Sequence, residues 1–178
     1  LEGIGVSRVG FDGTNVWADD PVHGPRQLDG QEAEDYRVNS SPFPCHDWKS
    51  RYASAKTIGS RDEDGRKLWD VELTTPLGRK VTMGFDAETK LLSTVQMKVS
   101  SPQGEVPTQT HFDEYKDVGG YRFAHVQRSK LPGIFEIAHT YEKIDVEAQV
   151  DAAIFDRDHH REVVDADPGE VPAEAQPD

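Results

Sequence analysis

Hydrophobic and polar residues alternate with a period of two over most of the chain, and turn residues interrupt the alternation every eight to twelve positions or so. This alternation is typical of antiparallel β-strands, in which successive side chains point to opposite faces of a sheet. The pattern is clearest between about Gly65 and Ile144, where we expect a long meander. Nearer the N-terminus, Val6–Phe11, the turn Asp12-Gly13 and Asn15–Ala18 predict a further hairpin.

Turn residues divide the meander into strands. The apolar positions of the first three strands are Trp69, Val71 and Leu73, then Val81, Met83 and Phe85, then Leu91, Val95, Met97 and Val99. Three further strands are expected at Glu105–Tyr115, Tyr121–Arg128 and Ile134–Ile144, separated by turns at Gly119-Gly120 and Pro132-Gly133. Connections this short join antiparallel neighbours, so the pattern predicts a sheet with one apolar face and one polar face.

Two segments predict short helices instead, and a third predicts a single helical turn. Asp29–Val38 is rich in Gln, Glu and Ala, and Asp29 is a suitable N-cap residue with Glu32 three positions later. A second helix is expected within Phe43–Ala53, where Trp48 and Tyr52 would supply apolar contacts. Asp151–Phe155 predicts a last helical turn. We therefore expect one or two short helices on one side of the sheet.

The composition excludes several classes of function. The chain has 178 residues, with 20 Lys and Arg against 33 Asp and Glu, and a formal net charge of −13. Nucleic-acid phosphates require a basic patch, so nucleic acid is not an expected partner. No apolar run approaches the ~18 residues of a membrane-spanning helix. The single cysteine, Cys45, excludes an intrachain disulfide and a multi-cysteine metal site.

The length is typical of one domain. We expect that domain at residues 1–155, followed by a disordered acidic tail at 156–178 that contains three prolines. The first residues, from Leu1 onward, lack the basic segment and the long apolar segment that a signal peptide has. We therefore expect the chain to derive from a longer precursor.

Six turn motifs occur one after another within about residues 1–155. The motifs are Gly10–Trp17, Gly24–Leu28, Asp64–Arg66, Phe85–Leu92, Ser101–Gly104 and Tyr115–Gly120. Together they resemble the outer-membrane lipoprotein-sorting-like proteins, which belong to the superfamily of periplasmic lipoprotein carriers. The resemblance implies a curved antiparallel half-barrel with one or two short helices on its concave side. Members of the family have a helix and several strands before the position of Leu1, so an N-terminally incomplete half-barrel is expected.

The resemblance further implies an apolar hollow that holds a lipid or the acyl chain of a lipoprotein, in the periplasm or at the outer membrane, without catalysis and without a cofactor. The residues expected to contact the ligand are Trp17, Trp48, Trp69, Met83, Phe85 and Met97. Thioether side chains adapt to variable apolar ligands, which suits the two methionines to this role. The alternative is that the same fold serves as an accessory subunit, pairing an open sheet edge with a membrane-associated protein.

Two other groups of residues suggest chemistry. His111, His125 and His139 are spaced fourteen apart, about the turns near Val118 and Pro132. Hairpins symmetric about those residues would align the three imidazoles on one face, a pattern that suits zinc. A register slip of one residue would separate them, and the simpler interpretation is a solvated polar face.

Cys45-His46-Asp47 suggests a cysteine nucleophile, although a buried apolar thiol at a helix start is the simpler interpretation. Acidic pairs such as Asp19-Asp20 and Asp113-Glu114 lack the ligand spacing of a calcium loop. Arg26 is a candidate contact for an anionic head group. The chain has no phosphate-binding glycine loop and no Gly-x-Ser-x-Gly elbow.

Overall fold

The computed structural model describes residues 7–39, 45, 47–101, 104–131 and 135–155 of the chain. The chain divides into two compact units. Unit 1 combines residues 1–28 with 149–178, and unit 2 comprises residues 29–148. The single domain expected over residues 1–155 stays a prediction, and the predicted disordered tail at 156–178 lies outside the described residues.

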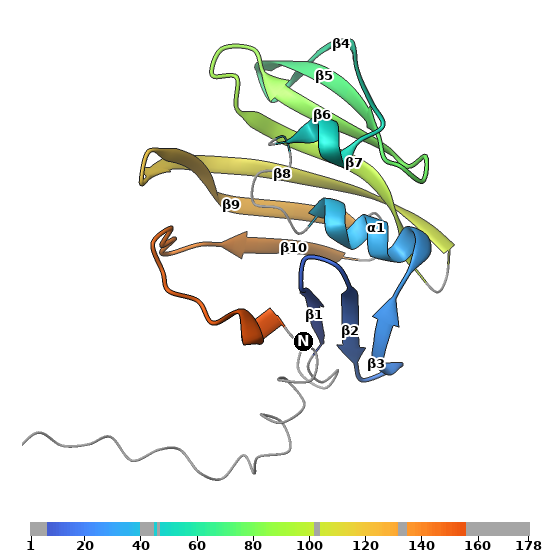
Figure 1. Ribbon diagram of the computed structural model, residues 1–178. Helices are drawn as coiled ribbons and strands as arrows, with labels where there is room; N and C mark the ends of the chain where they lie inside the picture. The colour runs from blue at the N-terminus through green and yellow to red at the C-terminus, as the bar shows by residue number, and fades with distance from the viewer. Residues whose placement is uncertain (1–6, 40–44, 46, 102–103, 132–134, 156–178) are drawn as a thin grey trace, which may run out of the picture. The chain divides into compact units, whose positions relative to one another are not determined.

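Unit 1 contains a small antiparallel sheet (Figure 1). Its strands are β1 (Arg8–Phe11), β2 (Val16–Asp20) and β3 (Gly24–Leu28), in that order, and a 3-10 turn, η1, spans Ala152–Phe155. Gly10 pairs with Trp17 across the β1–β2 hairpin, and the Trp17 indole nitrogen donates a hydrogen bond of 2.9 Å to the Phe155 carbonyl oxygen. The first predicted hairpin and the last predicted helical turn are therefore confirmed.

Unit 2 is built on an antiparallel sheet of seven strands in the order β10-β9-β8-β7-β6-β5-β4. The strands are β4 (Ser54–Glu63), β5 (Arg66–Thr74), β6 (Lys80–Asp86), β7 (Leu92–Ser101), β8 (Gly104–Val118), β9 (Tyr121–Leu131) and β10 (Phe135–Thr140). Each strand pairs with its neighbour in sequence, as a meander requires. The predicted fold class, a mainly β protein with a curved antiparallel sheet and short helices, is confirmed.

Two helices belong to unit 2, α1 (Gly30–Asn39) and α2 (Trp48–Arg51). Figure 1 shows α1 lying across strands of the sheet, and α1 contacts β7. We call the face that packs against Val38 of α1 the inner face. Its buried side chains form one apolar cluster with Val38 and Tyr52. The members of that cluster on the strands are Leu73, Val81, Met83, Leu92, Val95 and Met97.

Two parts of the prediction differ from the structure. The helix expected within Phe43–Ala53 is reduced, in the described residues, to the single turn of α2, and residues 40–44 and 46 lie outside them. The sequence pattern also missed β4, because its residues are almost all exposed and charged side chains interrupt any apolar alternation. The predicted turn at Pro132-Gly133 lies outside the described residues. No helix within the described ranges is long and apolar enough to cross a membrane.

Candidate ligand-binding face

Three ladder pairs of β5 and β6 form a continuous apolar strip along the inner face. The pairs are Leu73 opposite Val81, Val71 opposite Met83, and Trp69 opposite Phe85, and we call these residues the inner-face strip. Residues two apart on a strand point to the same face, so the strip runs roughly 13 Å along β5. Side chains of β7, including Met97, continue the apolar surface sideways.

Burial changes along the strip. Met83 is 1% exposed and Leu73 is also buried, whereas Trp69 at the other end is 44% exposed. Phe85 lies between these extremes and packs against the buried cluster. The strip therefore begins beneath the helices and ends at the surface, which is the arrangement an elongated apolar ligand needs.

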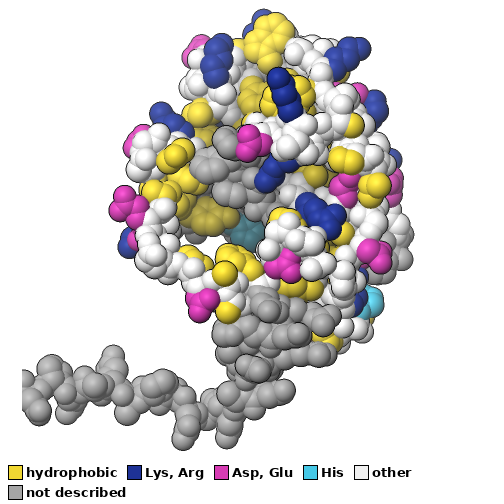
Figure 2. Space-filling model, in the orientation of Figure 1, with side chains coloured by type: hydrophobic (Ala, Val, Ile, Leu, Met, Phe, Trp, Pro, Cys, Tyr) yellow, Lys and Arg dark blue, Asp and Glu magenta, His cyan; other side chains and the backbone are white. Residues whose placement is uncertain are grey.

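The buried end of the strip is covered by the protein's own side chains. Val38 of α1 and Tyr52 belong to the same cluster as Met83, and Cys45 packs against it. At this end of the described inner face the side chains therefore pack against one another. Figure 2, viewed with α1 in front of the sheet as in Figure 1, shows hydrophobic side chains grouped among charged ones on this side.

Two grooves in the surface of unit 2 have a different character. One encloses about 570 Å³ and the other about 450 Å³. Charged or polar side chains supply much of each wall, among them Arg79, Lys98 and Glu105 in the first groove and Arg66 and Asp113 in the second. Neither groove has the predominantly apolar lining that an acyl chain requires.

The structure brings four of the six expected ligand contacts together and separates the other two. Met83, Met97 and Phe85 meet in or against the apolar cluster, with Trp69 beside Phe85 at its exposed end. Trp48 lies on α2, none of whose residues is buried, with the Lys49 ammonium 5.8 Å from its ring. Trp17 belongs to unit 1, where it is buried.

Cys45 and Tyr52 add polar atoms to this apolar cluster, and no sequence pattern connects either residue with a ligand. The Cys45 Sγ lies 3.7 Å from the Met83 Sδ. Burial raises the pKa of the Cys45 thiol to about 11, so the group is protonated at neutral pH and is a poor nucleophile. The structure thus favours the interpretation of Cys45 as a packing residue, and His46 lies outside the described residues.

Alkylation of the native protein tests the protection of this thiol. We expect Cys45 to react with iodoacetamide at pH 7.5 at least tenfold more slowly than in the urea-unfolded chain, because the native thiolate is scarcer. Mass spectrometry of timed samples measures both rates on the same, single cysteine. Equal rates in the two states would contradict the burial of the thiol.

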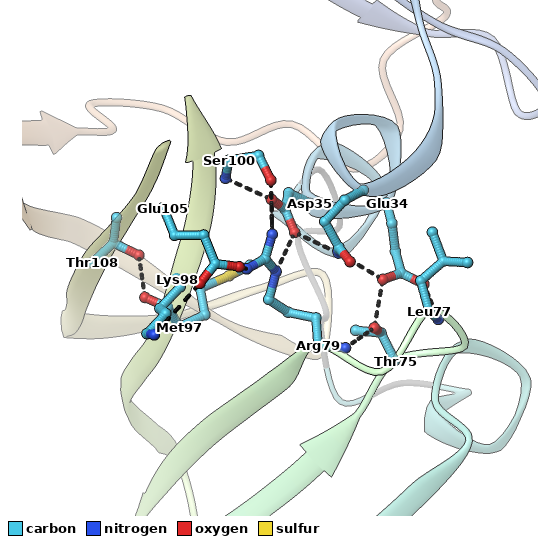
Figure 3. Close-up of polar contacts among 11 residues, drawn as sticks. Glu34, Asp35, Thr75, Leu77, Arg79, Met97, Lys98, Ser100, Glu105 and Thr108 are labelled. Carbon is cyan, nitrogen blue, oxygen red and sulfur yellow. Dashed lines mark hydrogen bonds and ion pairs between the residues drawn. The ribbon is translucent and has the colours of Figure 1, made fainter. Parts of the chain in front are cut away.

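A charged network attaches α1 to the strand ends (Figure 3). The Arg79 guanidinium donates two hydrogen bonds of 2.9 Å to the Asp35 carboxylate, a bidentate pair, and also bonds Ser100 at 2.8 Å and Glu105 at 2.6 Å. The side chains of Arg79 and Asp35 are only 5% and 6% exposed. Arg79, and Lys98 beside it, lower the pKa of Glu105. This pair joins α1 to the residue directly before β6.

The neighbouring carboxylate of α1 holds the turn between β5 and β6. Glu34 accepts hydrogen bonds from the Thr75 hydroxyl and, at 2.9 Å, from the Leu77 backbone nitrogen. Thr75 Oγ1 in turn accepts a bond of 2.9 Å from the Arg79 backbone nitrogen. The buried side of α1 therefore carries two carboxylates as well as Ala33 and Val38, and it positions the helix over the buried end of the strip.

The hypothesis that His111, His125 and His139 align to hold a zinc ion is wrong, because the turn between β8 and β9 sets a different register. Gly119 and Gly120 both adopt positive φ and form a two-residue turn in which Val118 pairs with Tyr121. His111 consequently pairs with Arg128, three residues from His125 and on the opposite face. Within the part of the chain that the structure describes, no three His, Cys, Asp or Glu side chains are arranged to hold a metal ion.

The remaining charged candidates have partners within the protein. Asp20 accepts a hydrogen bond of 2.9 Å from the His23 backbone nitrogen and lies 4.0 Å from Arg26. Asp113 pairs with Arg128 at 2.7 Å. These groups shape turns and connect strands, and no observation assigns them to a cation or a head group.

Comparison with known proteins places this geometry in a known fold. No protein-family model matches the chain, and no curated protein matches its sequence. Its structure is similar to that of a LolA superfamily protein from Nitrosomonas europaea, with a TM-score of 0.52 over 82% of this chain and 67% of that one, at 14% identity. The chain has a LolA-like fold. The similarity in sequence is too low to carry any residue's role across.

A second structural neighbour is a DUF1329 family protein from Desulfovibrio piger. The TM-score is 0.57, at 14% identity, and the match covers 89% of this chain and 72% of that protein. The predicted resemblance to the lipoprotein-carrier superfamily is thereby confirmed for the fold. The chain spans about two thirds of the length of the first of these structures and somewhat more of the second.

Proposed function

We propose that this protein binds the acyl chain of a lipid or lipoprotein along the inner-face strip, without catalysis, in the bacterial envelope. The observation that carries the proposal is the change in burial along one apolar strip, from Met83 at 1% exposure to Trp69 at 44%. The LolA-like fold supports the ligand class and a periplasmic or outer-membrane-associated location, since one neighbour bears the LolA name.

The energetics of the exposed end favour an apolar guest. A hydrocarbon chain lying over Trp69 and Phe85 would remove aromatic surface from water, worth about 25 cal/mol per Å². Met83 lies in the middle of the strip, and Met97 lies beside Val81 at its buried end. Their unbranched thioether side chains change rotamer at low cost, so the filled part of the strip is able to accommodate a guest.

Replacing Trp69 with alanine tests the strip as the binding surface. We expect about tenfold weaker binding of a fluorescent fatty acid, because the variant loses an aromatic contact of roughly 1–2 kcal/mol. Fluorescence titration measures the dissociation constants. The matched control is Leu77→Ala, which removes an exposed hydrophobic side chain from the β5–β6 turn, and we expect wild-type binding from it.

Equal effects of Trp69→Ala and Leu77→Ala would contradict binding on the strip. Failure of the wild-type protein to bind would contradict acyl binding altogether and leave the alternative, an accessory subunit. That alternative is favoured by β10, an edge of the unit 2 sheet with exposed residues at 136–140. The other edge, β4, carries charges and a bulge near Gly59, which are devices that discourage strand addition.

A further inference from the structure

Tyr52 places a hydroxyl group without a partner inside the apolar cluster. The residue is 4% exposed, and its hydroxyl oxygen is buried and makes no hydrogen bond within the described structure. Most buried polar side-chain atoms in proteins make a hydrogen bond, because leaving one unpaired costs about 1–3 kcal/mol of stability. The exception therefore calls for a partner that is not part of the chain's described residues.

A second buried phenol in unit 2 shows the ordinary arrangement. The Tyr115 hydroxyl donates a hydrogen bond of 2.8 Å to the Leu92 carbonyl oxygen. Burial raises the pKa of both Tyr52 and Tyr115 to about 12, so both hydroxyls carry their protons at neutral pH. Tyr52 thus differs from Tyr115 in having a donor that is available.

The position of Tyr52 relates this donor to the inner-face strip. The Ala53 backbone nitrogen donates a hydrogen bond of 2.7 Å to the Thr74 carbonyl oxygen, which fixes Tyr52 next to the end of β5. Tyr52 packs in the same cluster as Leu73 and Met83. Its hydroxyl is therefore a polar atom at the buried end of an apolar path that opens at Trp69.

The Tyr52 hydroxyl suits an oxygen acceptor, because it keeps its proton at neutral pH and makes no hydrogen bond within the described structure. The chain neighbours of Tyr52 are less buried than Tyr52 itself, since Arg51 is partly exposed and Ala53 is exposed. The hydrocarbon would extend along β5 and β6.

We propose that the Tyr52 hydroxyl donates a hydrogen bond to the carbonyl oxygen of an acyl group, ester or free acid, whose hydrocarbon chain lies along the inner-face strip toward Trp69. This inference rests on the proposed function and adds to it the residue that anchors the acyl carbonyl group. An acyl carbonyl is the polar group directly attached to such a chain, and it supplies the acceptor that the buried donor lacks.

The test compares three probes on wild type and Tyr52→Phe. Lauric acid, methyl laurate and dodecane share the hydrocarbon, but only the first two have a carbonyl oxygen. Displacement of the uncharged dye N-phenylnaphthylamine measures each affinity. We expect Tyr52→Phe to weaken binding of both carbonyl probes about fivefold and to leave dodecane unchanged. We also expect its urea midpoint to be equal to or above the wild-type value, since an unpaired hydroxyl is removed.

Tyr115→Phe is the matched control. It also removes a buried phenol hydroxyl, but one that already has a partner, so we expect a lower urea midpoint and unchanged affinities for all three probes. Equal losses for lauric acid and methyl laurate assign the anchor to any acyl carbonyl, and a loss for lauric acid alone assigns it to a free carboxyl group. Either result supports Tyr52 as the anchor.

Two other results separate failure of this inference from failure of the proposed function. Unchanged affinity of Tyr52→Phe for every probe would overturn the role of Tyr52, while binding of dodecane would still support the strip. No binding of any probe to the wild-type protein would overturn both.

Discussion

Replacing Arg79 with methionine is expected to lower the free energy of unfolding by about 3–5 kcal/mol. The Asp35 carboxylate, 6% exposed, would lose its bidentate guanidinium partner and remain buried. Breaking a buried ion pair from one side costs far more than the pair's net contribution, because the remaining charge keeps its desolvation penalty. Methionine retains most of the apolar stem of arginine, so lost packing contributes little to the change.

Urea denaturation followed by far-UV circular dichroism measures this loss. The control is Lys80→Met at the neighbouring position, where the ammonium pairs with Glu72 at 2.7 Å but is mostly exposed. Exposed pairs contribute about 0–1 kcal/mol, so we expect a change of at most that size. Similar effects of the two variants would show that the Arg79–Asp35 pair is not buried in solution.

The second large effect is expected from Gly10→Ala in unit 1. A Cβ at position 10 would lie 2.2 Å from the Trp17 indole, which is itself buried. Trp17 would have to shift and would release its hydrogen bond to the Phe155 carbonyl oxygen. We expect a loss of roughly 3 kcal/mol, at the upper end of the cost of overpacking.

Hydrogen exchange resolved to single amides measures this loss where it arises, in β1 and β2. Val9→Ala is the matched control, since it alters an exposed side chain on the same strand, and we expect a change below about 0.5 kcal/mol. Wild-type protection of β1 and β2 in Gly10→Ala would contradict the close contact between Gly10 and Trp17.

The strands of the meander were predictable because local rules determine them. Alternation at Trp69, Val71 and Leu73 placed one face of β5 correctly, and the Gly119-Gly120 turn separates β8 from β9 as expected. The register was not predictable at the same precision. The pairing of Val118 with Tyr121 displaces His111 by three residues from His125, and no local pattern shows a displacement of that kind.

The attachment of α1 illustrates a second limit. A helix that packs on a sheet usually shows an apolar stripe, but the buried side of α1 includes Glu34 and Asp35. Their partners, Thr75 and Arg79, are more than forty residues away, so the sequence offers no periodic signal for the contact. Burial of these carboxylates becomes understandable only when the strand ends are placed beside the helix.

The candidate site was partly predictable for a related reason. Met83, Met97 and Phe85 were identified by residue type and strand phase, which also determine their positions on the inner face. Tyr52 was identified only as an apolar contact of a helix. Its distinguishing property, a buried hydroxyl without a partner, depends on which atoms surround it in space and has no counterpart in the sequence.

The finite extent of the apolar strip along β5 has a consequence for selectivity. Each methylene group of a bound acyl chain that lies on the strip between Tyr52 and Trp69 would add about 0.8 kcal/mol to the free energy of binding. Carbons beyond Trp69 would project into water and add nothing. Affinity would then rise with the number of carbons and reach a plateau, so that discrimination among lipids is set by molecular length and head groups matter less.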